Sequence, residues 1–302
     1  MHIDFQGRVA IVTGAGGGLG REHALALAAR GARVLVNDLG AAAPGSSGAA
    51  GAAQQVADEI VAAGGQALAS TASVTDPVAV AAMVGQAMAA WGRVDILVNN
   101  AGILRDKSFA KMTLEDFRRV LDVHLMGAVH CCQSVWPIMA AQKHGRIVMT
   151  TSSSGLYGNF GQSNYGAAKM ALVGLMQTLA IEGAKSGIRV NCLAPTAATR
   201  MTEGLLPADA LALLEPAAVV PALLWLVSDD APTRAIACAG AGTFAAAHVT
   251  LTPGLHLGRG DEVPEQLASA WAQVSDRRGE TVPDSGAAQG RNEVMQAIAA
   301  RA

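Results

Sequence analysis

The stretch VAIVTGAGGGLGREHALALAARGARVLVND (residues 9–38) decides the fold. A short β-branched apolar run, Val9–Thr13, leads into a glycine-rich turn and then into an Ala/Leu-rich segment of helical length, Gly18–Arg30. A second apolar run, Arg33–Asn37, follows and ends next to Asp38. A strand, a turn, a helix and a strand in this order predict one βαβ unit with two parallel strands.

The same alternation continues along the chain. It predicts further buried strands at Ala67–Ser70, Val94–Asn99, Arg146–Thr151 and Ile188–Leu193. It predicts further helices at about 50–63, Pro77–Trp91, Thr113–Gln142 and Ser163–Ser186. We therefore predict an α/β fold: a single-domain, Rossmann-type, doubly wound parallel sheet with helices on both faces. The Gly/Ala/Ser-rich segment Leu39–Gly51 predicts a loop.

The character of the sequence changes near residue 255. We assign residues 1–255 to a dinucleotide-binding and catalytic domain and residues 256–302 to a C-terminal extension. Helices are expected in the extension near Pro264–Val274 and Arg291–Ala300. We expect this extension to pack on the core or on a neighbouring subunit.

Composition excludes several classes of protein. The 302 residues are 51% hydrophobic and 15% charged, with a net charge of −2, which permits a large core and disfavours nucleic acid as a partner. The four cysteines form no CxxC pair, so we expect no metal site and a reducing compartment. Because no basic segment precedes a long apolar run at the N-terminus, we expect no signal peptide, no membrane span and a cytoplasmic location.

The turn TGAGGGLG (residues 13–20) places Gly14, Gly18 and Gly20 in the spacing GxxxGxG. Backbone N–H groups in such a turn can approach a pyrophosphate, and the N-terminus of the following helix favours its negative charge. Asp38, at the end of the second strand, can accept hydrogen bonds from both ribose hydroxyls and would repel a 2′-phosphate. We therefore predict NAD rather than NADP. The alternative is that the glycine-rich turn only connects strand to helix and that Asp38 is a solvated acid at a strand end.

A second stretch, SSSGLYGNFGQSNYGAAK (residues 152–169), carries the predicted chemistry. Tyr165 and Lys169 stand at positions i and i+4 of a predicted helix and so share one face. An ammonium group lowers the pKa of a neighbouring phenol, which can then exchange a proton with a substrate oxygen. Ser152 follows the fifth strand, where its hydroxyl can bind the same oxygen. A Tyr–Lys pair on a helix surface is the alternative for this spacing taken alone.

In combination these motifs resemble the short-chain dehydrogenase/reductase family over about residues 5–255. TGAGGGLG resembles its cofactor loop, and Asn99–Gly102 resembles its NNAG segment. The resemblance implies that Tyr165 is the acid/base, that Ser152 orients the substrate oxygen, and that Lys169 lowers the tyrosine pKa and holds the nicotinamide ribose. The cofactor-binding residues that it implies are Gly14, Gly18, Leu19, Gly20, Asp38, Ser73, Val74, Asn100, Ala101, Gly102, Tyr165, Lys169, Pro195 and Thr199.

Two positions depart from the family pattern. His124 stands where the family usually has an asparagine that anchors a water chain to the lysine. It is either a catalytic residue of that relay or a structural residue of the helix interior. Pro195 is followed by Thr196 where the family usually has glycine, and Thr199 resembles the hydroxyl that binds the carboxamide of the nicotinamide.

A narrower resemblance concerns substrate. The segments NAGILRDKSFAKMT, DVHLMG, GRIVMTTSSSGLYGNFGQSNYGAAK, LAIEGAKSGIRVN and AGAG resemble the (3R)-hydroxyacyl-CoA dehydrogenase unit of peroxisomal multifunctional enzyme type 2 and its free-standing bacterial relatives. This implies oxidation of a (3R)-3-hydroxyacyl-CoA or a 17β-hydroxysteroid. Arg105 and Lys107 are candidates for the phosphates of CoA, and Met201–Leu214 is a candidate lid.

The family also implies a homodimer or homotetramer formed through the long helices. Two alternative functions stay open. One is a 3-oxoacyl carrier-protein reductase, against which Asp38 argues because biosynthetic reduction normally draws on NADPH. The other is a non-catalytic NAD-binding sensor, which would have no need of the Ser152, Tyr165 and Lys169 set.

Overall fold

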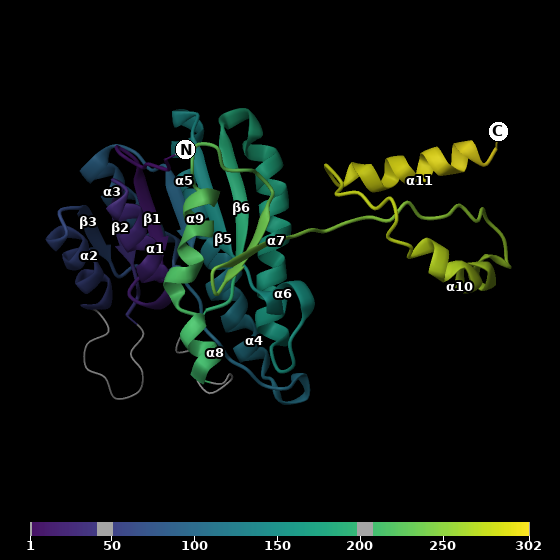
Figure 1. Cartoon of the computed structure of the whole chain (residues 1–302), viewed down its shortest axis with the longest axis horizontal. Helices are drawn as coiled ribbons and strands as arrows, with labels where there is room; N and C mark the ends of the chain where they lie inside the picture. Colours follow the sequence, from purple (N-terminus) through teal and green to yellow (C-terminus); the bar gives the residue numbers. More distant parts are fainter. Residues whose placement is uncertain (1, 41–50, 198–207, 302) are drawn as a thin grey trace. The chain divides into compact units, whose positions relative to one another are not determined.

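The computed structural model describes residues 2–40, 51–197 and 208–301. These described residues form an eight-stranded sheet in the order β3-β2-β1-β4-β5-β6-β7-β8 (Figure 1). The strands are β1 Val9–Thr13, β2 Arg33–Asn37, β3 Gln66–Ser70, β4 Ile96–Asn99, β5 Gly145–Thr150, β6 Ile188–Pro195, β7 Ile236–Gly240 and β8 Thr243–Ala247. Strands β1 to β7 pair in parallel, and their order reverses at β1, which confirms the predicted doubly wound sheet.

Helices cover both faces of the sheet. They are α1 Gly18–Ala29, α2 Ala52–Ala62, α3 Pro77–Trp91, α4 Leu114–Leu121, α5 Gly127–Gln142, α6 Ser153–Tyr157, α7 Ser163–Gly183, α8 Ala208–Leu213 and α9 Val220–Leu226. Helix α1 contacts α2 and α9 on one face, whereas α3 contacts α5 on the other. The predicted start of α3 is confirmed: the Asp76 side chain caps the N–H groups of Val78 and Ala79, and Pro77 opens the helix.

The core explains the continuous apolar strands. All five residues of β1 are buried, because helices cover both of its faces. Ala10 and Val12 belong to the cluster formed with α1, α2 and α9, whereas the intervening Ile11 is fully buried outside that cluster. Because successive side chains of a strand point to opposite faces of the sheet, β1 contributes to a core on each face.

The long helix predicted over Thr113–Gln142 is present as α4, a π-helical segment at Asp122–Met126 (η3) and α5, which follow one another without a break. We did not predict the π-helical segment, α6, β7 or β8 from the sequence. Strand β8 is exposed over most of its length and so lacks a buried pattern. Ala241 and Gly242, with φ of 48° and 70°, form the tight turn before it.

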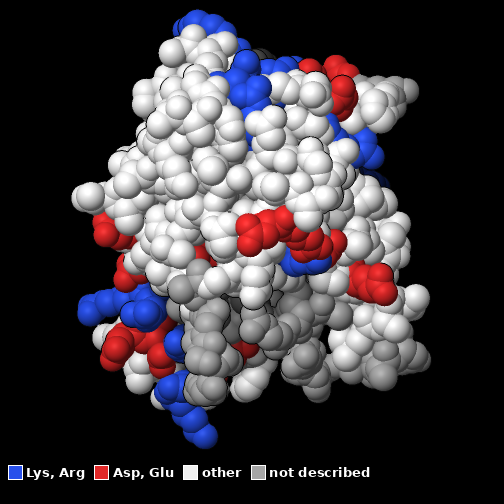
Figure 2. Space-filling model, turned by 90° about the vertical axis from the view of Figure 1, so that its left-hand side faces the viewer, with Lys and Arg blue, Asp and Glu red and all other residues white. Residues whose placement is uncertain are grey.

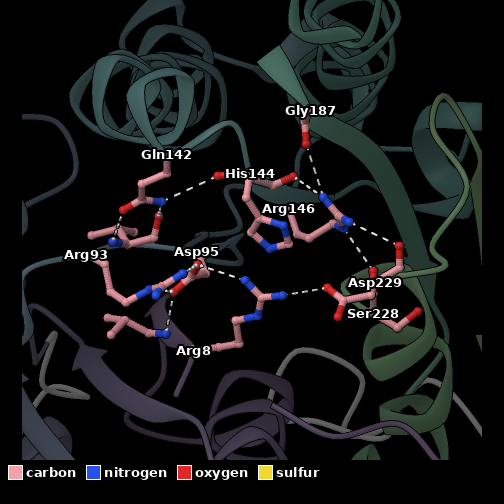
Figure 3. A network of polar contacts seen from close by, with 12 residues as sticks. Arg8, Arg93, Asp95, Gln142, His144, Arg146, Gly187, Ser228 and Asp229 are labelled. Atoms are coloured by element: carbon pink, nitrogen blue, oxygen red, sulfur yellow. Dashed lines mark hydrogen bonds and ion pairs between the residues drawn. The ribbon is translucent and has the colours of Figure 1, made fainter. Parts of the chain in front are cut away.

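A network of charged side chains lies where β1, β4 and β5 begin, whereas the glycine-rich turn follows the end of β1. Figure 3 shows this network. The Asp95 carboxylate, whose side chain is 0% exposed, accepts hydrogen bonds from Arg93, from Arg8 and from the Val9 backbone N–H. Buried Arg146 donates to backbone carbonyls in four residues, Gly145, Gly187, Ser228 and Asp229. This network ties β1, β4, β5 and the segment after α9 together.

The chain divides into two compact units, Met1–Ala246 and Ala247–Ala302. The second unit contains α10 Val263–Val274, at the position predicted, and α11 Ala287–Ala299, which begins four residues before the predicted Arg291. Leu251 pairs with Thr281, and Asn292 donates a hydrogen bond to the Pro253 carbonyl. No residue of the described α10 and α11 is buried within the chain.

On the face of the molecule shown in Figure 2, acidic and basic side chains form small groups separated by uncharged surface. The described residues on this face make no extended basic surface of the kind that binds nucleic acid. In residues 2–40, 51–197 and 208–301, no helix has both the length and the apolar character needed to cross a membrane.

Candidate active site

The glycine-rich turn lies at the carboxyl end of β1, the strand that pairs with both β2 and β4. Close packing requires glycine at two positions of the turn. Gly14 has a φ of 63°, and a Cβ there would lie 2.7 Å from the Cα of Ala101. A Cβ at Gly20 would lie 2.8 Å from the Cα of Ala15. Helix α1 begins after Gly17, with no acidic residue in its first turn. Its N-terminus therefore fits an anion such as a pyrophosphate.

Asp38 lies beside this turn, at the end of β2. Its Oδ2 accepts a hydrogen bond of 2.9 Å from the Gly16 N–H, and its Oδ1 accepts one of 2.8 Å from the Gly40 N–H. Both bonds hold the carboxylate at the strand end next to the phosphate-binding turn. Each oxygen keeps a second lone pair, so the carboxylate can still accept a hydrogen bond from a ribose hydroxyl.

The NNAG segment is joined to the glycine-rich turn through Asn100 and Thr13. Asn100 Nδ2 donates to the carbonyls of Thr13 (3.1 Å) and Gly14 (3.0 Å). Thr13 Oγ1 in turn accepts from the N–H groups of Asn100 and Ala101. The carboxyl ends of β1 and β4 are thus held as one surface. We did not predict a role for Thr13, although it is the first residue of the TGAGGGLG turn.

Tyr165 and Lys169 lie one turn apart on α7, as their spacing predicts. Lys169 is 3% exposed, and its Nζ donates a hydrogen bond of 2.6 Å to the Thr150 carbonyl at the end of β5. The same Nζ lies 5.4 Å from the centroid of the Tyr165 ring. Ser152 caps α6, and its side chain acts on Tyr165, whose pKa it lowers. The three side chains therefore form one cluster.

Burial determines the pKa values in this cluster. It raises the pKa of Tyr165, the Ser152 hydrogen bond opposes this shift, and the charge of Asp106 adds to it. Burial also lowers the pKa of Lys169 to about 7. The reason is shared, because removal from water disfavours both the phenolate and the ammonium.

His124 lies in the π-helical segment and faces the cluster. Its ring is perpendicular to the Tyr165 ring, with the centroids 5.2 Å apart. Its Nε2 lies 3.0 Å from the backbone N and 2.8 Å from the backbone O of Ile103. Burial, together with the charge of Lys169, lowers the pKa of His124 to about 3, so the ring is neutral at physiological pH. Its buried Nδ1 has no hydrogen-bond partner among the described residues.

His124 also connects Tyr165 to the glycine-rich turn. A Cβ at Gly102 would overlap the His124 ring, just as a Cβ at Gly14 would meet Ala101. A chain of direct contacts therefore runs from the turn through the NNAG segment and His124 to Tyr165. The structure brings these predicted residues together at one edge of the sheet.

The remaining predicted cofactor residues lie around the same edge, with one exception. Val74 lines a small cavity together with His124 and Lys169, and its carbonyl lies 2.9 Å from His130 Nδ1. The neighbouring Ser73 hydroxyl contacts Thr75. Leu19 lies in the first turn of α1, and Pro195 ends β6. Thr199 lies outside the described residues, as do much of the candidate lid Met201–Leu214 and most of the predicted loop Leu39–Gly51.

The two cations proposed for CoA phosphates are already paired. Lys107 Nζ lies 2.9 Å from Asp116 Oδ2, and Arg105 Nε lies 3.9 Å from Asp116 Oδ1. This carboxylate offsets part of their charge. Among the described residues, no group of three or more His, Cys, Asp or Glu side chains is arranged to hold a metal ion.

Two amides next to the catalytic cluster were not predicted from the sequence. Asn164, fully buried, donates to the Arg105 carbonyl and accepts from the Tyr165 N–H. Gln162 bonds to Ser154 and to Asp106. Both amides stand within three residues of Tyr165, but nothing in the sequence shows that their partners Arg105 and Asp106 lie on a segment 59 and 56 residues away.

A doubly wound sheet, a glycine-rich turn and a Ser–Tyr–Lys cluster at its carboxyl edge define an oxidoreductase of the short-chain dehydrogenase class. The chain belongs to this family: the family model described as short chain dehydrogenase matches residues 8–209. It is 46% identical over 285 residues to the peroxisomal multifunctional enzyme type 2 of Drosophila melanogaster, covering 91% of this chain and 46% of that enzyme. It therefore spans about half the length of that relative.

The solved structure of the full-length Drosophila enzyme matches with a TM-score of 0.81 and 37% identity, over 98% of this chain and 50% of that chain. The (2S)-[(R)-hydroxy(phenyl)methyl]succinyl-CoA dehydrogenase subunit of Thauera aromatica is 38% identical over 238 residues, covering 76% of this chain and 92% of that subunit. A 7α-hydroxysteroid dehydrogenase solved with NADH and 7-oxoglycochenodeoxycholic acid matches with a TM-score of 0.71 and 32% identity, over 79% of this chain and 95% of that one.

Proposed function

We propose that this chain oxidises the secondary alcohol of a (3R)-3-hydroxyacyl-CoA to the ketone, with NAD as the hydride acceptor. The observation that carries this proposal is the cluster of Tyr165, Lys169 and Ser152, linked by direct contacts to the glycine-rich turn. A phenol held in this way can remove a proton from a substrate hydroxyl.

The residues present fit a dinucleotide. Gly14 and Gly20 leave room for close approach, α1 offers its N-terminus to the pyrophosphate, and Asp38 offers an acceptor to the ribose. When bound, the nicotinamide would accept a hydride from the alcohol carbon. The carboxylate of Asp38 favours NAD over NADP because it would repel a 2′-phosphate. The 7α-hydroxysteroid dehydrogenase solved with NADH supports the same cofactor class.

Side chains of the protein bind the substrate hydroxyl and take its proton. Ser152 donates a hydrogen bond to the reacting oxygen, and deprotonated Tyr165 takes the hydroxyl proton as the hydride leaves the carbon. Lys169, anchored on Thr150, places positive charge near the phenolate when it is protonated. His124 packs against the tyrosine ring and fixes the backbone of Ile103, so we assign it a positioning role.

The acyl-CoA substrate is supported by the similarity to the (2S)-[(R)-hydroxy(phenyl)methyl]succinyl-CoA dehydrogenase subunit of Thauera aromatica. A hydroxysteroid is the second candidate, supported by the 7α-hydroxysteroid dehydrogenase. We also propose a cytoplasmic location: all four cysteines are free, and Cys131, Cys132 and Cys192 are buried, as in a reducing compartment.

We propose a homo-oligomer, either a dimer or a tetramer. Helix α10 exposes Leu267 and Trp271 one turn apart, and α7 exposes Met170 and Ile181. A second copy of the chain would cover these apolar side chains. Sedimentation of a single monomeric species over a wide range of concentrations would refute this proposal.

The test of function is NAD reduction with (3R)- and (3S)-3-hydroxyacyl-CoA of several chain lengths, compared with 17β-hydroxysteroids. We expect turnover with the (3R) thioesters and its loss in Tyr165→Phe. Tight NAD binding without oxidation of any alcohol would overturn the enzymatic proposal and favour a sensor. A preference for NADPH with 3-oxoacyl carrier-protein substrates would favour a reductase.

A further inference from the structure

The side chain of Gln162 joins three segments that surround the catalytic cluster. Gln162 immediately precedes α7, three residues before Tyr165. Its Oε1 accepts hydrogen bonds from Ser154 Oγ (2.8 Å) and Asn159 Nδ2 (3.1 Å). Its Nε2 donates a hydrogen bond of 2.7 Å to Asp106 Oδ2. The amide therefore uses both of its ends.

This side chain is one link from the catalytic serine. The backbone N–H of Ser154 donates to Ser152 Oγ over 3.2 Å, and the Ser152 side chain in turn lowers the pKa of Tyr165. Hydrogen bonds thus connect the Asp106 carboxylate through Gln162 and Ser154 to Ser152, the side chain that acts on Tyr165. Gln162 is the point at which the series crosses from one segment of the chain to another.

The backbone on both sides of Asp106 is held by bonds that do not involve the Gln162 side chain. The buried Asn164 side chain donates a hydrogen bond of 3.0 Å to the Arg105 carbonyl, and the Lys107 N–H donates one of 2.9 Å to the Gly161 carbonyl. These two bonds run on either side of the Asp106–Gln162 contact and align residues 105–107 with residues 161–164. The backbone that carries the Asp106 carboxylate is therefore held beside the amide.

We propose that Gln162 is a positioning residue, which sets the placement of the Ser152 hydroxyl relative to the Tyr165 hydroxyl from its anchor on Asp106. This inference rests on the proposed function and deepens it. An amide of this length meets the requirement, because its oxygen accepts from two donors while its nitrogen donates to a carboxylate. A carboxylate at position 162 would accept from Ser154 but would repel Asp106.

The negative charge of Asp106 also affects the pKa of Tyr165. The charge of Asp106 raises the pKa of Tyr165, and the other titratable groups that face the phenol are Lys169, 5.4 Å from the ring centroid, and the neutral His124. The two roles of Asp106 can be separated. Asp106→Asn keeps an acceptor for the amide of Gln162 but removes the charge, whereas Gln162→Glu keeps the shape but loses the donor.

The first measurement is steady-state kinetics of Q162E, D106N and the D106N/Q162E double variant, with melting temperatures as a check on folding. We expect Q162E to lower kcat by about tenfold, since misplaced catalytic groups lose rate steeply, and to leave the KM for NAD unchanged. In the double variant the amide and the carboxylate exchange places, so the hydrogen bond re-forms in the opposite direction and kcat recovers to within about threefold of the wild type.

The second measurement does not depend on turnover. The chain has two tyrosines, so in a Tyr157→Phe background the ultraviolet absorbance of tyrosinate reports Tyr165 alone. We expect D106N to move the titration midpoint to lower pH and Q162E to move it to higher pH, with the double variant near the parent protein.

The outcomes separate the two proposals. Wild-type turnover with an unchanged kcat in Q162E would overturn the positioning role, as would loss of activity in Q162E that the double variant does not rescue. Identical midpoints in all variants would also overturn it. If the midpoints shift as expected but the wild type oxidises no alcohol, the coupling of Asp106 and Gln162 to Tyr165 stands and the proposed function falls.

Discussion

The Nζ atom of Lys169 lies 5.4 Å from the centroid of the Tyr165 ring, and both side chains are largely removed from water. Burial lowers the pKa of the lysine to about 7 and raises that of the tyrosine. At neutral pH the tyrosine is therefore a phenol, and the lysine is divided between its charged and neutral forms. This arrangement determines how the site should respond to substitution and to pH.

Removal of the Tyr165 hydroxyl should abolish most of the activity. We expect Tyr165→Phe to reduce kcat by roughly 10²–10⁴-fold, which is the usual contribution of a general acid or base. Isothermal titration should show that NAD binding changes little. The matched control is Tyr157→Phe, because Tyr157 is 72% exposed; equal losses in the two variants would contradict the assignment.

The two directions of the reaction should depend on pH in opposite ways. Alcohol oxidation requires the Tyr165 phenolate, and because the pKa of Tyr165 is raised, its rate should increase as the pH rises above neutral. Ketone reduction requires the phenol and should decline over the same alkaline range. Initial rates in both directions, measured across one buffer series, test this; parallel profiles would argue against Tyr165 as the proton donor and acceptor.

Lys169 should lower stability while it supports activity. Its pKa is about 7 when folded and 10.5 in the unfolded chain, so between these values the unfolded state binds more protons and the unfolding free energy rises with pH. The cost of burying the charge is therefore largest below pH 7. We expect Lys169→Met to lower kcat and to raise the unfolding free energy by about 1–3 kcal/mol at pH 6, which combines the relieved desolvation with the lost bond to Thr150.

Denaturant unfolding at pH 6 and at pH 10 measures this effect. The gain in Lys169→Met should shrink toward pH 10, where the wild-type lysine is neutral when folded at little cost. A variant less stable than the wild type at pH 6 would contradict the prediction.

Asp38 should determine the choice of cofactor. We expect Asp38→Ala to reduce the preference for NAD over NADP by roughly 10- to 100-fold, because hydrogen bonds to a charged group contribute about 1.5–3 kcal/mol. Values of kcat/KM for the two cofactors give the ratio. Asp58→Ala, which removes an exposed acid of α2, is the control. An unchanged ratio in Asp38→Ala would contradict the role of this carboxylate.

Asp95 should affect stability and not chemistry. We expect Asp95→Ala to lower the unfolding free energy by about 3–5 kcal/mol, because it leaves buried donors and cations without their partner. Asp229→Ala, at the exposed end of the same network, should cost under about 1 kcal/mol. Although burial opposes it, the pKa of Asp95 is lowered by its bonds to Arg93 and to the Val9 N–H. The stability that Asp95 contributes should therefore be lost as the pH falls below its unfolded value of 3.8.

Much of the fold could be predicted because the relevant signals are local. The apolar runs that become β1 and β2, the glycines between them and the cap of α3 each act within a few residues of their own position. Strand β8 could not be predicted because most of its side chains are exposed and its place in the sheet depends on β7. The π-helical segment around His124 was not predicted because the helical pattern of the sequence continues through it on both sides.

The sequence by itself determined which residue types occupy the ends of the strands and that Tyr165 and Lys169 share one face of a helix. It did not determine the direction in which the pKa of Tyr165 moves, because that depends on how deeply the folded chain removes both groups from water. It also did not show that Asp106 and Gln162 meet, since 56 residues separate them and only the packing of α7 beside the segment after β4 brings them together. Local spacing specifies candidate chemistry, whereas burial and long-range contacts, which only the tertiary structure provides, decide its strength and its partners.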